Sequence, residues 1–386
     1  MIIFYLILGS IFGIIAGLTP GLHTNTIIAL IAISPIFGKE IMVLVLSMSI
    51  VQTFVEFIPS TFLGVPSTTT FEGVLPAHKM LIQGEGINAI TLTVFGGIIA
   101  TIVGVLITPI IFLLLEQNQR EIILITPIIL LLTPIIMIQQ EKSFRKKIIS
   151  IFIIFIATTQ GLIFSGQIFA LITGYFGVSA TLYSLKEKNI IKKQNTEINI
   201  ENKITDPILG LIGGTIVAII PGIGSNTAAT IIKTFKLKIQ EKNYLTMLGS
   251  INTANFFFGF ITLFALKKTR NGAMIFLQDK ITLTQETMIL GIIIMVISAG
   301  IGGFATIQLS KIMINFFNEN LTRKLNIISL LIMIFATIIT GGILGIITLI
   351  FSTSLGLFTI SKKVKRSLCM NSLIIPTLFF YLFILI

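Results

Sequence analysis

Apolar residues form long blocks along this chain, and short polar segments separate the blocks. Many blocks reach the length of about 20 residues that a helix needs to cross a bilayer. The pattern therefore predicts ten membrane-spanning helices, five in each half of the chain. They are expected at 41–59, 88–115, 122–138, 148–165, 167–185, 244–266, 287–317, 325–339, 343–360 and 369–386.

Two further apolar segments are each interrupted by nearly the same motif. Leu18–Thr26 is LTPGLHTNT, and Ile219–Thr227 is IIPGIGSNT. Proline lacks the amide that continues a helix and glycine accepts unusual backbone angles, so a helix stops there. The Thr and Ser that follow are residue types that favour a new helix start. The motif predicts a re-entrant helical hairpin in each half of the chain, over 1–37 and 208–235.

The two halves repeat one another. At a spacing of 201 positions, Gly9 matches Gly210, the Pro-Gly and Asn-Thr pairs of the two motifs match, and Ser49-Ile50 matches Ser250-Ile251. Each repeat then contains five spans and one hairpin broken at Pro-Gly. We expect a first repeat, a polar linker and a second repeat at 1–185, 186–206 and 207–386.

Basic residues set the expected orientation. Loops rich in Lys and Arg stay in the cytoplasm, and such loops lie at 142–147, 186–203, 233–242 and 362–366. With these loops inside, 116–121 lies outside, whereas its counterpart 318–324 lies inside. The two repeats then have inverted topology, an arrangement typical of secondary transporters.

Composition supports an all-α polytopic membrane protein. Hydrophobic residues make up 54% of the 386 residues and charged residues 11%, against about 25% charged residues in soluble proteins. The net charge of +12 follows from the basic loops, so we expect membrane lipid and not a nucleic acid as its partner. Cys369 is the single cysteine, so no disulfide forms within the chain. The expected location is the cell membrane.

The interrupted helices suggest an anion site. A helix start carries free N–H groups and a partial positive charge, and two such starts brought together suit an anion. Carbonyls freed at each break suit Na⁺. The alternative is that both breaks are hairpin tips capped by their own side chains. The predicted substrate-binding residues are Pro20, Gly21, Thr24, Asn25, Thr26, Pro221, Gly222, Ser225, Asn226, Thr227, Asn252 and Asn255.

Other polar residues are candidates for gating and coupling. The segment 57–86 is long and polar, and part of it is expected to dip toward the site; the alternative is an ordinary cytoplasmic loop. Glu56 lies in an apolar run, where an ionisable group is a functional candidate, here for coupling to Na⁺ or H⁺. No cofactor and no bound metal are expected. The candidate gate or charge partners are Ser67, Thr68, Lys79 and Arg270.

These motifs resemble those of a known family. PGLHTNT, FIPSTFLGVPSTTTFEGVLPAHKMLIQGEG, PGIGSNT, and INTANFFFGF followed by KKTRNGA occur in this order. The chain is similar to the TctA-like permeases, the large membrane subunit of tripartite tricarboxylate transporters, and most of all to their archaeal relatives. The resemblance implies a secondary carrier for an organic anion such as a di- or tricarboxylate, moved with a cation. It also implies a small membrane subunit and an extracytoplasmic binding protein as partners.

Two other classes of function are weighed against the permease. Carriers of polyprenyl phosphate also use paired re-entrant hairpins with Pro-Gly motifs, and a helix-end site suits their phosphate head group as well as a carboxylate. An enzyme is disfavoured because the sequence contains neither HExxH nor GxSxG. A homo-oligomer is compatible with the sequence.

Overall fold

The protein is described from a computed structural model, which is all-helical over the residues it describes. These are residues 1–19, 24–31, 36–62, 71–141, 143–185, 194–195, 204–220, 224–235, 240–267, 269, 271–316 and 319–385. Within this part of the chain, eight helices are long and apolar enough to cross a membrane. The polytopic, all-α fold class predicted from the sequence is confirmed.

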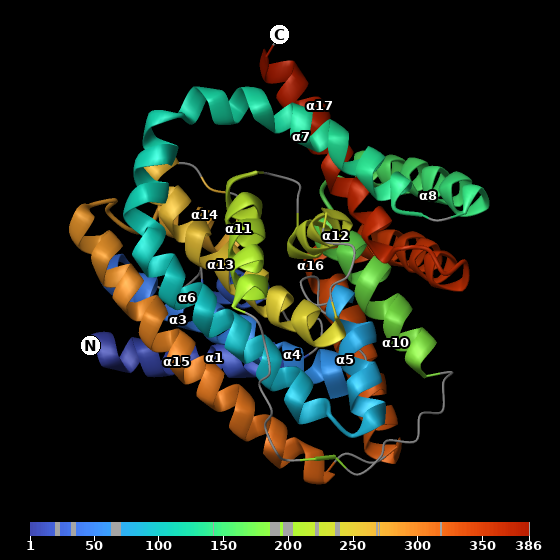
Figure 1. Cartoon of the computed structure of the whole chain (residues 1–386), viewed down its shortest axis with the longest axis horizontal. Coiled ribbons are helices and arrows are strands. Elements are labelled where there is room, and N and C mark those ends of the chain that lie inside the picture. The colour runs from blue at the N-terminus through green and yellow to red at the C-terminus, as the bar shows by residue number, and fades with distance from the viewer. Residues whose placement is uncertain are drawn as a thin grey trace.

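Figure 1 shows the elements in chain order. Before residue 186 they are α1 (Ile2–Leu18), α2 (Thr24–Ile31), α3 (Gly38–Val55), α4 (Phe57–Phe62), α5 (Phe71–Gln83), α6 (Gly86–Gln117), α7 (Gln119–Gln139), α8 (Phe144–Ile163), α9 (Ile168–Ile172), the π-helical segment η1 (Thr173–Val178) and α10 (Ser179–Ser184). After the linker they are α11 (Thr205–Ile219), α12 (Ser225–Phe235), α13 (Glu241–Leu266), α14 (Gly272–Gln278), α15 (Gln285–Phe316), α16 (Glu319–Ser361), the 3₁₀ segment η2 (Arg366–Met370) and α17 (Asn371–Leu385).

Both Pro-Gly motifs interrupt a helix as predicted. Helix α1 ends at Leu18 and α2 begins at Thr24. Helix α11 ends at Ile219 and α12 begins at Ser225. Residues 20–23 and 221–223, which include the two Pro-Gly pairs, lie outside the described part of the chain.

Helices α3 and α13 form the centre of the molecule. The described residues Ile41–Val55 of α3 are all buried, and so are most residues of α13. The long helices α6 and α15 pack against this centre and expose apolar side chains such as Leu106 and Phe304 on their outer sides. Exposed apolar side chains on long helices are expected where lipid is the solvent.

Glycines allow the central helices to approach closely. A Cβ added at Gly96 of α6 would overlap the Thr246 carbonyl oxygen, and one at Gly249 of α13 would overlap the Thr93 carbonyl oxygen. Helix α15 meets α3 in the same way, because a Cβ at Gly302 would lie 3.1 Å from Val51 Cα. Small residues at helix contacts are the usual means of close packing in membrane proteins.

Helices α1 and α11 contact the two central helices in matching ways. A Cβ at Gly9 would overlap the Leu44 carbonyl oxygen of α3. A Cβ at Gly210 would overlap the Met247 carbonyl oxygen of α13. Gly9 and Gly210 form one of the pairs that match when the two halves of the sequence are compared at a spacing of 201 positions.

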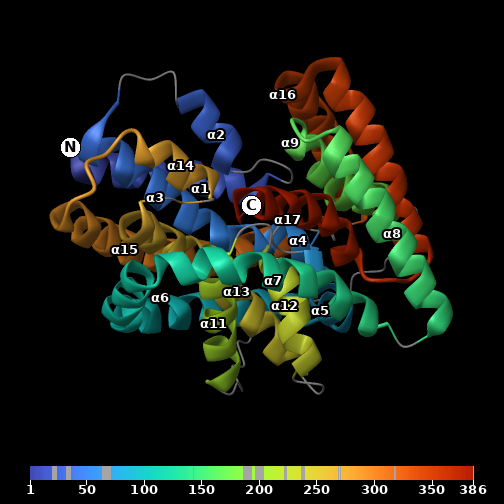
Figure 2. The same ribbon diagram turned by 90° about the horizontal axis from the view of Figure 1, so that it is seen from above.

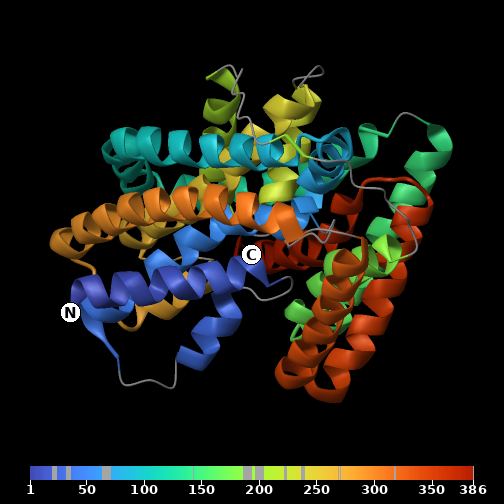
Figure 3. The same cartoon turned by 90° about the horizontal axis from the view of Figure 1, so that it is seen from below.

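A second group of helices stands beside this centre. Helix α8 packs against α17, and α16 packs against α9, η1 and α10. Figures 2 and 3 show α8 and α16 on the opposite side of the molecule from α1 and α15. Helix α7 joins the two groups, since it follows α6 in the chain and packs against α17.

The ten predicted spans differ at two places from the eight long apolar helices among the described residues. The segment 167–185 forms one continuous helical stretch, Ile168–Ser184, which contains the π-helical segment and is shorter than the eight long helices. The segments 325–339 and 343–360 form one element, α16. This element nevertheless folds back at Gly342, whose backbone angles are not helical (φ 55°, ψ −144°). The fold-back brings the two arms together: a Cβ added at Gly345 would lie 2.9 Å from the Thr337 carbonyl oxygen. In a straight helix these two residues would be about 12 Å apart along the axis.

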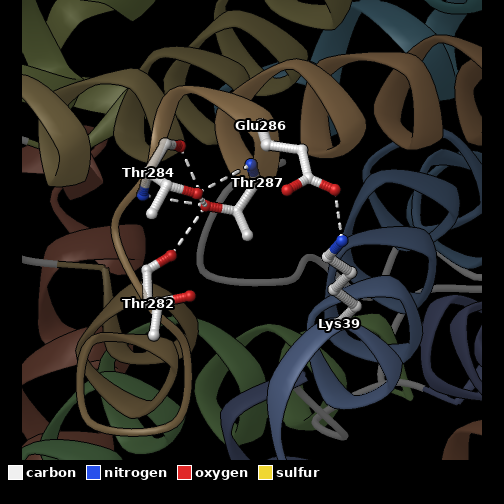
Figure 4. A network of polar contacts seen from close by, with 5 residues as sticks. All are labelled: Lys39, Thr282, Thr284, Glu286 and Thr287. Carbon is white, nitrogen blue, oxygen red and sulfur yellow. Dashed lines mark hydrogen bonds and ion pairs between the residues drawn. The ribbon is translucent and has the colours of Figure 1, made fainter.

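Polar contacts join helix ends at one face of the molecule. Lys39 at the start of α3 forms an ion pair with Glu286 at the start of α15 (Figure 4). Thr284 and Thr287 cap the start of α15 reciprocally. The Thr284 backbone N–H donates to the Thr287 hydroxyl at 3.0 Å, and the Thr287 backbone N–H donates to the Thr284 hydroxyl at 3.3 Å. Gln119, after the end of α6, donates to the Ala265 carbonyl oxygen at 3.2 Å. We call this the α14 face, after the short helix found there.

Other helix ends meet at the opposite face. Lys242 at the start of α13 pairs with Glu85 before α6 at 3.1 Å. Helix α13 is about 39 Å long at 1.5 Å per residue, and its other end lies at the α14 face. Gln194 of the linker donates to the Leu81 carbonyl oxygen at 2.8 Å. This is the linker face.

Candidate functional site

A buried polar cluster lies where α3 and α13 cross. The Thr53 and Thr253 hydroxyls are 3.4 Å apart. The Asn252 Nδ2 donates to the Thr53 carbonyl oxygen at 3.3 Å and to Glu56 Oε1. Both partners are acceptors, so the orientation of the Asn252 amide is fixed by its surroundings. The two central helices are therefore joined by hydrogen bonds inside an otherwise apolar core.

Glu56 is the buried carboxylate of this cluster. Its side chain follows the last turn of α3, and the residue is 4% exposed. Its backbone N–H bonds to the Gln52 carbonyl oxygen at 3.0 Å, so the helix holds it in place. Burial of a carboxylate is costly unless it is hydrogen-bonded or balanced by a cation. The position of Glu56 agrees with the requirement for a coupling residue, a role that stays a prediction.

The start of α2 is held by a side chain from α3. Thr24 is 3% exposed, and its backbone N–H donates to Gln52 Oε1 at 2.9 Å. The Thr24 hydroxyl contacts the same oxygen. Gln52 lies one turn before Glu56 on the same face of α3. The start of α2 is thus connected to the polar cluster at the crossing.

The start of α12 is linked to α13 in a similar way. Asn255 Nδ2 lies 3.4 Å from the Ser225 hydroxyl. Ser225, Asn226 and Thr227 are each at most 4% exposed. Among the described residues, the Thr227 hydroxyl has no hydrogen-bond partner. Asn252 and Asn255, predicted to share a helix face, therefore serve different neighbours: the first contacts α3 and the second contacts α12.

Several predicted site residues cannot be compared with the structure. Asn25 and Thr26 lie on α2, but their side chains are not described. The remaining ones lie outside the described residues; they are Pro20, Gly21, Ser67, Thr68, Pro221, Gly222 and Arg270.

Lys79, a predicted gate or charge partner, lies at the surface. Its ammonium group forms an ion pair with Glu241 at 2.6 Å, and more than half of the side chain is exposed. The segment 57–86 contains two helices, α4 and α5. Helix α4 is fully buried, including Ser60 and Thr61. Helix α4 continues the span of α3, Gly38–Phe62, and Lys79 on α5 lies at the linker face. The expected dip of this segment toward the site stays a prediction.

Gln52 is the functional candidate that the sequence analysis missed. A single glutamine in an apolar run is a weak signal, and its partner Thr24 is 28 positions away. The only local clue is its spacing from Glu56, which puts both polar side chains on one helix face. A search for polar pairs one turn apart within apolar helices would have found it.

The long apolar helices define a multi-pass membrane protein, and a buried polar cluster lies between them. The chain matches the tripartite tricarboxylate transporter TctA family over residues 3–371, and it belongs to this family. The resemblance stated from the motifs is confirmed, and the family is one of transporters and not of enzymes. An uncharacterized protein of Methanocaldococcus jannaschii is 28% identical over 400 residues, an alignment that covers 98% of each chain. No solved structure matches the chain.

Proposed function

We propose that this chain is the large membrane subunit of a secondary transporter that moves a di- or tricarboxylate together with Na⁺ or H⁺. Membership of the TctA family supports the class of substrate. The observation that carries the proposal is the polar cluster in which Glu56 and Asn252 join α3 to α13. A buried carboxylate beside two interrupted helices supplies both elements of coupled transport, a cation ligand and an anion site.

The two halves are proposed to be inverted repeats at 1–185 and 207–386, joined by the linker at 186–206. The matching glycine contacts of α1 on α3 and of α11 on α13 support this arrangement. So do two ion pairs between helix starts, Lys39 with Glu286 and Lys242 with Glu85, which lie at opposite faces. The pairs α1–α2 and α11–α12 are proposed to be re-entrant hairpins whose tips meet the central helices.

The substrate is proposed to bind in the region where the starts of α2 and α12 meet the central helices, beside Asn252 and Asn255. Backbone N–H groups and hydroxyls at these starts supply donors to a carboxylate. Each interaction with a helix end contributes about 0.3–2 kcal/mol, which is too little to hold a di- or trianion away from water. A cation near Glu56, or a basic side chain such as Arg270, is therefore part of the proposal.

The proposed partners follow from the family, whose name describes a tripartite system. A small membrane subunit and an extracytoplasmic binding protein would deliver the substrate to this chain. A homo-oligomer is compatible with the proposal.

Uptake into liposomes tests the proposed function. The purified chain, with its partner subunits where the genome encodes them, is reconstituted and offered labelled citrate, succinate and a neutral sugar. We expect uptake of at least one carboxylate that increases with an inward Na⁺ or pH gradient, and no uptake of the sugar. Carboxylate uptake that ignores both gradients would contradict coupled transport. Passage of a labelled polyprenyl phosphate without carboxylate uptake would support the alternative, an anionic-lipid translocase.

A further inference from the structure

We propose that the two helix starts are not equivalent, and that the substrate carboxylate binds at the start of α12 and not at the start of α2. This inference rests on the proposed function and assigns its anion site to one half of the molecule. It follows from the different chemistry of the groups that face the two starts.

The start of α2 is already occupied by an acceptor. The Thr24 backbone N–H donates to Gln52 Oε1 at 2.9 Å, and the Thr24 hydroxyl contacts the same atom. A backbone N–H is only a donor, so the amide atom facing it is the oxygen and the orientation of Gln52 is fixed. This oxygen takes the place that a carboxylate oxygen would need. Glu56, one turn along α3, adds a second acceptor group to the same face.

The start of α12 is faced by a different kind of group. Asn255 is one methylene shorter than Gln52, and its Nδ2 approaches the Ser225 hydroxyl at 3.4 Å. A hydroxyl that accepts a hydrogen bond keeps its own proton available for a ligand. The first residues of α12 are Ser225, Asn226 and Thr227, which supply hydroxyls and an amide and no negative charge.

The Thr227 hydroxyl is the second observation that points to a ligand. Thr227 is 0% exposed and lies in the first turn of α12, and its hydroxyl makes no hydrogen bond within the described part of the chain. Thr230, one turn later on the same helix, bonds to the Asn226 carbonyl oxygen at 2.9 Å as buried threonines in helices commonly do. Leaving a buried hydroxyl without a partner is unfavourable, and a carboxylate oxygen would satisfy it.

The start of α12 is also covered. A Cβ at Gly224 would lie 2.9 Å from Met370 Cε of η2, so an apolar side chain lies directly against the residue that precedes the helix. Exclusion of water lowers the local dielectric constant and strengthens hydrogen bonds to a charged ligand. The occupant inferred from this geometry is a carboxylate group of the transported anion.

Ligand-induced thermal stabilisation tests the assignment without requiring transport. The purified full chain is titrated with citrate and with succinate in detergent, and the apparent Kd is taken from the shift in melting temperature. Thr227→Val removes the hydroxyl at nearly constant volume, and we expect it to raise the Kd about tenfold, the effect of losing one hydrogen bond to a charged group. Thr230→Val is the matched control, because its hydroxyl is already bonded within the helix; its Kd should stay within about twofold of the unmodified chain.

The equivalent change in the first half discriminates between the two starts. We expect Thr26→Val to raise the Kd less than Thr227→Val does. Equal effects of the two changes, or a wild-type Kd in Thr227→Val, would overturn the assignment while leaving a carboxylate transporter in place. If neither carboxylate stabilises the unmodified chain, the proposed function itself fails. Should Thr227→Val not fold, Ser225→Ala is compared with Thr24→Ala in the same way, and the larger rise in Kd is expected for Ser225→Ala.

Discussion

Lys39 at the start of α3 is paired with Glu286 at the start of α15, and the same kind of pair recurs between Lys242 and Glu85 at the other face. The two lysines are 203 positions apart in the sequence, and the two glutamates are 201 positions apart. Each pair therefore joins a central helix of one half to a long helix of the other. All four side chains are at least 41% exposed, so each pair contributes only about 0–1 kcal/mol to stability. The two pairs are useful because they mark the α14 face and the linker face of the molecule.

The first prediction concerns which side of the membrane each face occupies. Gln117, at the end of α6, should react with an impermeant thiol reagent from outside when changed to Cys, because it belongs to the α14 face. Asn195 and Lys362, changed to Cys, should react only after the membrane is opened. All three residues are at least partly exposed, and the native Cys369 is buried and is replaced by Ser in the background. Labelling of Gln117→Cys and Asn195→Cys from the same side would contradict the assignment of the α14 face and the linker face to opposite sides of the membrane.

The second prediction concerns motion between α3 and α15. Lys39→Cys with Glu286→Cys, joined by a short bifunctional reagent, should transport at nearly the wild-type rate. Helices α3 and α15 are packed along their length, with Gly302 against Val51 and Gly291 against Leu46, and such contacts do not open easily. The measurement is uptake before and after cross-linking, with the unlinked double variant as control. Loss of uptake that returns when the link is cleaved would show that this pair is a gate.

The third prediction concerns the glycine packing. Gly249→Val should lower the melting temperature strongly, since a side chain there would overlap the backbone of α6 at Thr93. Overpacking of this kind costs about 1–3 kcal/mol or more. Gly300→Ala is the control, because nothing lies within 4 Å of its added Cβ. That change should be neutral or slightly stabilising, since alanine favours a helix more than glycine does. Similar melting temperatures of the two variants would contradict the helix contact.

The sequence predicted the interrupted helices well because their cause is local. Pro20-Gly21 and Pro221-Gly222 act on the backbone where they stand, and α1 and α11 end before them. The buried position of Glu56 was equally predictable, since an ionisable group in an apolar run must find partners.

Features that depend on distant partners were not predictable. The contact between Gln52 and Thr24 depends on how α2 folds back toward α3. The register of the central helix of each half, α3 and α13, differs as well. Sequence comparison matched Ser49 with Ser250, whereas the glycine contacts place Leu44 and Met247 in equivalent positions, a spacing of 203. The second half therefore has two more residues before its central helix, which no local pattern indicates.

The last prediction concerns coupling. Glu56→Gln keeps an oxygen that can accept from Asn252 Nδ2 but removes the negative charge. The protein should fold and bind a carboxylate, because the hydrogen bond that joins α3 to α13 survives. A neutral amide neither takes up a proton nor attracts Na⁺ as a carboxylate does. Uptake driven by an inward Na⁺ or pH gradient should therefore fall to the level seen without a gradient.

Glu141→Gln is the matched control for this change. Glu141 is also a buried carboxylate, 6% exposed, but it lies between α7 and α8, where it accepts from the Lys365 backbone N–H at 3.2 Å. Since it is not part of the α3–α13 crossing, its loss should leave the dependence on the gradient intact. The two variants are compared by initial uptake rates of the same labelled carboxylate over a range of gradients. Gradient-dependent uptake in Glu56→Gln equal to that in Glu141→Gln would place the coupling cation elsewhere.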